Sequence, residues 1–167
     1  GSGKTVVALA LLLVAVANGC QGAFMAPTEV LAEQHFLTVG RLLSGLAQPS
    51  RDARWFSVYV DPHPRPITIG LLTGSTPAAA RRELHTRMRD GAIDLLIGTH
   101  ALIQDEVALP NLAMAVVDEQ HRFGVMQRAS LRGKGRQPHL LVMSATPIPR
   151  TLALTLYADL EVSPIPE

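Results

Sequence analysis

The sequence has little cysteine and little charge. Cys20 is its single cysteine among 167 residues, so no intramolecular disulfide can form and a reducing compartment is permitted. Charged residues make up 17% of the chain and hydrophobic residues 47%, which is typical of a globular domain and excludes a disordered segment. The net charge of +1 indicates no particular class of partner. The length suffices for one domain with a hydrophobic core.

The sequence also lacks an apolar run long enough to cross a membrane, which takes roughly 18 or more residues. The apolar stretch Val6–Ala17 follows Lys4 and precedes Cys20, an order that looks like the end of a lipoprotein signal. The motifs described below argue against an export signal. We therefore expect no membrane partner.

Basic residues gather in two places rather than along the whole chain. The two clusters are Arg81, Arg82, Arg87 and Arg89, and Arg122, Arg128, Arg132, Lys134 and Arg136. Either cluster could contact the phosphate backbone of a nucleic acid. The alternative is a solvated helix face, which composition alone favours.

Short apolar runs alternate with segments of helical period. The runs predict strands at Gly22–Ala26, Ile67–Leu72, Ile93–Ile97, Leu112–Val117 and Leu140–Met143. Helices are expected at residues 4–18, 28–46, 77–89 and 149–157. The first helix is apolar nearly all round, which indicates burial on most sides. Because the strands are apolar throughout, the pattern predicts an α/β fold with a mainly parallel sheet covered on both faces.

Residues 47–66 interrupt this alternation. Their prolines and aromatic residues are Pro49, Pro62, Pro64, Pro66, Trp55, Phe56 and Tyr59. We expect a surface loop or insertion here, with a short strand at residues 55–60 as an option.

The first five residues, Gly1-Ser2-Gly3-Lys4-Thr5, form the second half of the phosphate-binding pattern G-x-x-x-x-G-K-[ST]. In such a loop, backbone N–H groups and a helix N-terminus surround the phosphates. Lys4 would contact the β- and γ-phosphates, and Thr5 would bind Mg²⁺. A chance Gly-Ser linker is the alternative. If the loop is real, the strand that should precede it is absent.

Two further segments follow apolar strands and match such a loop. Asp118 and Glu119 come directly after the strand at 112–117, where Asp118 would hold Mg²⁺ through water and Glu119 would act as general base. A helix-capping pair is the alternative. Ser144-Ala145-Thr146 follows the strand at 140–143, and its hydroxyls could bond the acids and sense the γ-phosphate.

Together these segments resemble the first motor lobe of the superfamily 2 helicases over nearly the whole chain. The resembling segments are residues 1–8, 26–35, 72–75, 98–104, 118–125 and 144–154. Within the superfamily the chain is similar to bacterial helicases that act on replication forks and Holliday junctions. A transcription-repair coupling translocase shares segments 122–125 and 145–151, but it typically has Glu-Glu-Gln where this chain has Asp118-Glu119-Gln120-His121.

The resemblance implies a P-loop NTPase lobe of RecA-like, three-layer α/β/α fold that lacks its first strand. Residues 1–167 would be part of the ATP-binding lobe of a DNA helicase used in recombination and repair. ATP and Mg²⁺ would be its cofactors, and branched or double-stranded DNA, a second RecA-like lobe and a wedge domain its partners. Neither that lobe nor the wedge is expected within this chain. The implied location is cytoplasmic, at the bacterial nucleoid.

The resemblance also assigns residue roles. Gly1, Ser2, Gly3, Lys4 and Thr5 would bind the nucleotide, with Lys4, Asp118 and Glu119 in catalysis. Gln120, His121, Ser144 and Thr146 would couple hydrolysis to movement. The DNA-side residues would be Pro27, Thr28, Glu29, Thr73, Gly74, Ser75, Thr99 and His100, for which strand-end turn chemistry is the alternative.

Other hypotheses remain at this point. A small-molecule kinase would also need a phosphate-binding loop, but the segments at 118–121 and 144–146 argue against it. We further expect the isolated chain to be inactive even if the parent protein is a helicase.

Overall fold

The computed structural model describes residues 3–45, 52–103, 107–118 and 138–144. Its strands are β1 (Gln21–Met25), β2 (Trp55–Val58), β3 (Ile67–Leu72), β4 (Leu95–Gly98), β5 (Leu112–Asp118) and β6 (His139–Met143). Its helices are α1 (Lys4–Ala17), α2 (Glu29–Ser44), α3 (Ala78–Arg89) and the short 3-10 helix η1 (His100–Ile103). Each strand and helix expected within the described residues is therefore present, with ends shifted by a few residues.

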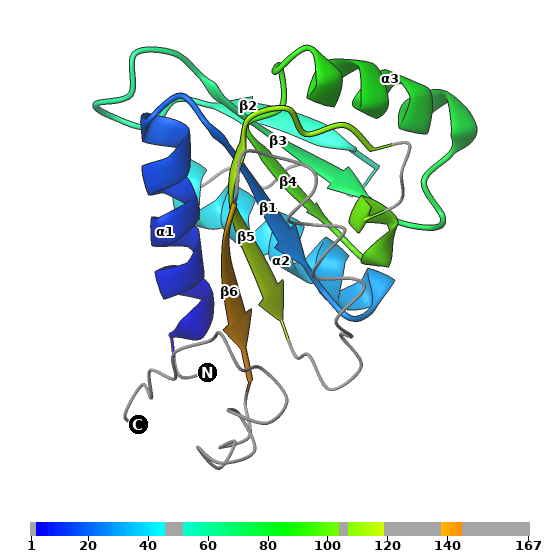
Figure 1. Ribbon diagram of the computed structural model, residues 1–167, viewed down its shortest axis with the longest axis horizontal. Helices are drawn as coiled ribbons and strands as arrows, with labels where there is room; N and C mark the ends of the chain where they lie inside the picture. Colours follow the sequence, from blue (N-terminus) through cyan, green and yellow to red (C-terminus); the bar gives the residue numbers. More distant parts are fainter. Residues whose placement is uncertain (1–2, 46–51, 104–106, 119–137, 145–167) are drawn as a thin grey trace.

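The described strands form one sheet in the order β2-β3-β4-β1-β5-β6. Strand β1 pairs in parallel with β4 on one side and with β5 on the other, and β3 and β6 extend the sheet in parallel beyond them. Strand β2 alone is antiparallel. The predicted α/β fold with a mainly parallel sheet is confirmed, and the parallel strands all end at one edge of the sheet (Figure 1).

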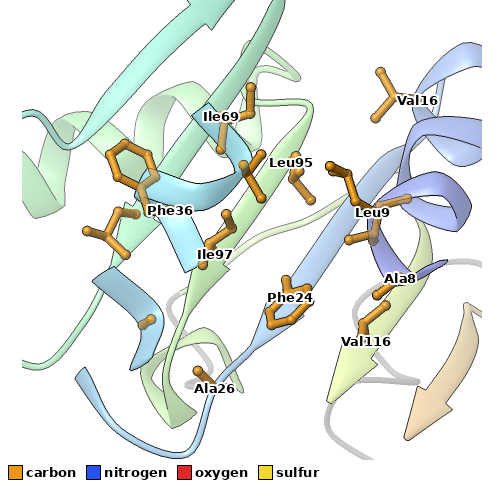
Figure 2. Packing of buried hydrophobic residues seen from close by; sticks show 14 of the residues in the cluster. Ala8, Leu9, Val16, Phe24, Ala26, Phe36, Ile69, Leu95, Ile97 and Val116 are labelled. Atoms are coloured by element: carbon orange, nitrogen blue, oxygen red, sulfur yellow. The ribbon is translucent and has the colours of Figure 1, made fainter. Parts of the chain in front are cut away.

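The two faces of the sheet carry separate hydrophobic clusters. On one face, side chains of α1 and α2 pack against Phe24, Ile97 and Val116 (Figure 2). On the other face, Leu84 and Met88 of α3 pack with residues of η1 and the opposite side of the strands. Successive strand residues point to opposite faces, which explains why buried strands covered on both sides are apolar throughout.

Helix α1 differs from the expectation that it is buried on most sides. Ala8, Leu9, Leu12 and Val16 face the sheet, but the structure leaves Val6, Val7, Leu11 and Val14 exposed. The reason is geometric, because the helix packs on β1 and β5 along one side. Among the described residues, no helix combines the length and the apolarity needed to cross a bilayer.

Part of the segment 47–66 belongs to the sheet. Strand β2 is the optional strand considered for residues 55–60, and it pairs with β3 at the sheet's edge. Phe56 packs edge-to-face against Phe36 of α2, with ring centroids 5.1 Å apart. On the opposite face the Arg87 guanidinium lies 4.7 Å from the Trp55 ring centroid. That residues 47–66 form an insertion stays a prediction.

Buried polar side chains tie together the amino ends of the strands. The Asp94 carboxylate, 2% exposed, accepts two hydrogen bonds from Arg65 and one of 2.9 Å from the Thr68 N–H. The hydrogen bond with Asp94 raises the pKa of Arg65. The buried Gln21 amide makes a similar connection, and its partners are the carbonyls of Met88 and Ile93 and the N–H of Asn111. These contacts hold the edge opposite to the one where the parallel strands end.

Gly98 ends β4 at a point where no side chain fits. A Cβ atom there would fall against the carbonyl oxygen of Leu72 and 2.8 Å from Leu102 Cδ2. Gly98→Ala should lower the free energy of unfolding by about 3 kcal/mol, because a backbone carbonyl cannot move aside cheaply. Urea unfolding followed by circular dichroism measures this change.

Gly74→Ala is the matched control for this prediction. Its added Cβ would lie 2.9 Å from Glu29 Oε1, the far end of a flexible side chain that can turn away with the loss of only its hydrogen bond to the Ser75 N–H. We expect a loss below about 1 kcal/mol for this variant. Equal losses for the two variants would contradict the close approach at Gly98.

Candidate functional site

Three residues predicted to serve a nucleotide meet at the edge where the parallel strands end. Asp118 is the last residue of β5 and pairs in register with Met143 of β6, so Ser144 lies one residue further along the neighbouring strand. Lys4 opens α1, and its Nζ donates a 3.3 Å hydrogen bond to the Ser144 carbonyl oxygen. The start of α1 accordingly lies beside the end of β6 (Figure 1). The hydrogen bond between Lys4 and Ser144 joins residues 140 positions apart in the sequence.

The N-terminus of α1 suits a phosphate group. Gly3 precedes the helix with φ 72°, a left-handed conformation that glycine adopts without the strain of a side chain. Among the described residues no side chain caps this helix end, and its first turn carries no acidic residue. Uncapped N–H groups and the positive end of the helix dipole attract anions. The Lys4 ammonium adds a full positive charge at the same place.

The residues present also fit a magnesium ion that arrives with phosphate. Among the described residues no group of three or more histidine, cysteine, aspartate or glutamate side chains could hold a metal. In this part of the chain Asp118 offers one carboxylate, and the half-buried residue Thr5 in the first turn of α1 offers a hydroxyl oxygen. Mg²⁺ is commonly held by one or two carboxylates together with substrate phosphates. The donors among the described residues suit that arrangement.

Several predicted site residues lie outside the described residues. They are Gly1, Ser2, Glu119, Gln120, His121 and Thr146. The expected helix at 149–157 and the basic cluster at 122–136 lie outside them as well.

The residues predicted to face DNA come from three neighbouring strand ends. Pro27 and Thr28 follow β1, residues 73–75 follow β3, and residues 99–100 follow β4. Backbone hydrogen bonds continue past the strands, from the Ala26 N–H to the Gly98 carbonyl oxygen at 2.7 Å and from the Thr99 N–H to the Leu72 carbonyl oxygen at 3.3 Å. All three segments therefore lie side by side at the same edge as Lys4, Asp118 and Ser144, which we call the nucleotide group.

Exposure divides this predicted DNA-facing set. The exposed members are Pro27, Thr28, Gly74, Ser75 and His100. Thr73 is fully buried, and its N–H donates to Thr76 Oγ1 at 3.0 Å, so it shapes the turn. Thr99 is 2% exposed, and its hydroxyl has no hydrogen-bond partner among the described residues. Neither threonine side chain is presented to solvent.

Three contacts at this edge were not foreseen from the sequence. Arg81 donates to the carbonyl oxygens of Thr73 at 2.7 Å and Gly74 at 3.3 Å, so this member of the first basic cluster supports the turn. Glu29 Oε1 accepts a 2.9 Å bond from the Ser75 N–H. His35 Nε2 lies 2.9 Å from Asp118 Oδ2. The last two pairs are 46 and 83 positions apart, a separation that leaves no local sequence signal.

Comparison with known proteins places the chain in a family. The model of the DEAD/DEAH box helicase family matches residues 1–155. The chain is 53% identical to the ATP-dependent DNA helicase RecG of Synechocystis sp., over all of this chain and 18% of that protein. It is 47% identical to RecG of Bacillus subtilis, over all of this chain and 22% of that protein. The chain thus spans only about a fifth of the length of these relatives.

A solved structure of RecG bound to a three-way DNA junction is similar in fold. The TM-score is 0.65 at 39% identity, over 95% of this chain and 18% of that one. This likeness confirms the expectation of a helicase lobe with RecA-like α/β architecture. The chain belongs to the DEAD/DEAH box helicase family.

Proposed function

We propose that the chain is the first motor lobe of a longer ATP-dependent DNA helicase, which acts on branched DNA in recombination and repair. The observation that carries the proposal is the meeting of Lys4, Asp118 and Ser144 at the sheet edge that also holds the three predicted DNA-facing segments. Membership of the helicase family and the identity to proteins named RecG support it. A second RecA-like lobe and a wedge domain would be supplied by the rest of that longer protein, in the bacterial cytoplasm.

In this proposal the start of α1 holds the phosphates of ATP. Residues 1–3 would supply backbone N–H groups, Lys4 would neutralise the β- and γ-phosphates, and Thr5 and Asp118 would position Mg²⁺. The bound ion would neutralise charge that develops on the transferred phosphoryl group. Glu119 would accept the proton of the attacking water. Placement and electrostatic stabilisation supply most of the catalysis in reactions of this class.

Residues at the neighbouring strand ends would couple ATP hydrolysis to movement along DNA. Ser144 already contacts Lys4 through its carbonyl oxygen, so a shift of Lys4 toward phosphate would reach β6 directly. Gln120, His121 and Thr146 are proposed to take part because of the family resemblance. The second lobe would complete the site from the opposite side.

DNA would lie along the exposed part of the three strand-end segments. Ser75 and His100 are exposed there and offer polar atoms for phosphate contacts that do not depend on base sequence. The buried Thr73, the hydrogen-bonded Glu29 and Arg81 would hold the loop in shape for this contact. A transcription-repair coupling translocase would use the same edge on unbranched duplex, so substrate preference separates that alternative from the proposal.

A chimeric protein tests the proposal directly. We expect Synechocystis sp. RecG, with its matching segment replaced by this chain, to hydrolyse ATP and to be stimulated more by a three-way junction than by linear duplex. The 167-residue chain alone should show negligible DNA-stimulated hydrolysis, because the phosphates would be open to water on the side that a second lobe covers. A steady-state ATPase assay measures both. A folded chimera without ATPase activity would overturn the proposed function, and preference for linear duplex would favour the coupling translocase.

Lys4→Ala in the chimera should lower DNA-stimulated ATP hydrolysis by about 100-fold or more, the usual loss when one charge-stabilising group is removed. Binding of the three-way junction without ATP should persist, as measured by fluorescence anisotropy. Arg41→Ala removes an exposed cation from the last turn of α2 and is the matched control. Unchanged hydrolysis in Lys4→Ala would refute the assigned phosphate site.

His100→Ala should weaken junction binding about 5-fold, and by a similar factor for junctions of different sequence, because a lost phosphate contact carries no base information. Anisotropy titrations at fixed salt measure the change. His139→Ala is the control, since His139 is exposed at the amino end of β6, at the opposite edge. Equal effects of the two variants, or a loss confined to one sequence, would count against this DNA path.

A further inference from the structure

A hydrogen bond connects helix α2, which begins at the predicted DNA-facing edge, to Asp118 of the predicted nucleotide site. His35 lies on α2, the helix that begins beside Pro27 and Thr28, and Asp118 ends β5. His35 Nε2 and Asp118 Oδ2 are 2.9 Å apart, and the two side chains are only 14% and 17% exposed. Both members are therefore largely shielded from water, where a hydrogen bond to a carboxylate is stronger than at the surface.

The histidine ring is held from two sides. Its centroid lies 4.6 Å from that of Phe24, a core residue of β1 that is 2% exposed. Its helix is anchored on the sheet by Ala32 and Phe36, which are both buried. Because helix and ring contact both limit its movement, the imidazole offers Asp118 a fixed partner rather than a mobile one.

The start of α2 is fixed to the turn predicted to face DNA. Thr28 Oγ1 caps the helix by accepting from the Leu31 N–H at 3.3 Å, and Glu29 accepts from the Ser75 N–H at 2.9 Å. His35 follows about 9 Å further along the helix axis. One rigid element thus has its start on the predicted DNA-facing turn and its second turn on the carboxylate expected to serve Mg²⁺.

We propose that His35 is a positioning residue for Asp118 and that α2 links the DNA-facing edge to the nucleotide site through this contact. The inference rests on the proposed function. Nε2–H donates to Oδ2, which fixes the plane of the carboxylate that would serve the metal ion. Hydrogen bonds from residues that contact a metal-binding carboxylate, but not the metal, orient that carboxylate. Their loss typically costs about 10–100-fold in metal affinity or activity.

Two substitutions in the chimera separate this role from packing. His35→Phe keeps a ring to stack on Phe24 but removes the donor, and His35→Gln can place an amide N–H near the position of Nε2. We expect His35→Phe to raise the Mg²⁺ concentration for half-maximal ATPase about 10-fold and to lower kcat, with a small change in KM for ATP. His35→Gln should stay within about 3-fold of the unsubstituted chimera. Equal behaviour of the two variants, or a lower Mg²⁺ concentration for half-maximal ATPase in His35→Phe, would overturn the inference.

A binding measurement adds a readout that does not depend on turnover. Mn²⁺ titrated with ADP and followed by electron paramagnetic resonance should bind about 10-fold more weakly to His35→Phe than to His35→Gln. The DNA link is tested by Glu29→Ala, which removes the acceptor of the Ser75 N–H bond. This variant should reduce the stimulation by DNA several-fold while leaving Mn²⁺ binding within about 2-fold. Unchanged stimulation would remove the link to DNA from the inference.

Urea unfolding of the 167-residue chain tests the contact between His35 and Asp118 independently of ATPase activity. His35→Phe should lower the urea midpoint in the unsubstituted chain, and lower it much less when Asp118→Ala is already present, because the two residues share one interaction. Additive effects of the two substitutions would contradict the contact. An inactive chimera would instead count against the proposed function, so the two failures can be told apart.

Discussion

Parallel pairing around β1 is the constraint on which the rest of the molecule depends. Thr28 follows β1 and Asp118 ends β5. These strands are far apart in chain order but are neighbours in the sheet. Because parallel strands all end at the same edge, the pairing carries the ends of β3, β4, β1, β5 and β6 into one row. The nucleotide group occupies the β5–β6 end of that row, and the predicted DNA-facing group occupies the β3–β4–β1 part.

The two groups are built by different kinds of contact. On the DNA side, local turn bonds such as that from the Thr73 N–H to Thr76 Oγ1 shape each segment before any ligand is considered. On the nucleotide side, Lys4 and Ser144 meet only because the sheet has formed. The predicted nucleotide site is therefore the part that depends on the complete fold, whereas the turns depend more on local sequence. Polar contacts at the amino ends, around Asp94 and Gln21, stabilise the sheet without entering either group.

Much of this fold was predictable, because buried strands leave a simple signal. Strand β3 was predicted with the bounds observed, since an unbroken apolar run between turn residues is a strong indication. The sequence signal for strand β2 was weaker, because Trp55–Val58 is a short edge strand among prolines. The exposed side of α1 was not predictable from composition, because an apolar helix can pack on one side only. Lys4, Asp118 and Ser144 were found by motif, but the contact of His35 with Asp118 required the pairing of β1 with β5.

The burial of Thr73 and Thr99 changes how hydroxyl-rich strand ends should be understood. A motif that reads as a row of phosphate-binding hydroxyls places two of them inside the protein, where Thr73 organises the turn. The exposed polar atoms of Ser75 and His100 then sit on a frame fixed by Arg81 and Glu29. If the chain is part of a motor, as proposed, a rigid frame would help movement at the DNA to reach the nucleotide site. Helix α2 meets that requirement, since it is packed on the sheet along its length and bonded at both the turn and Asp118.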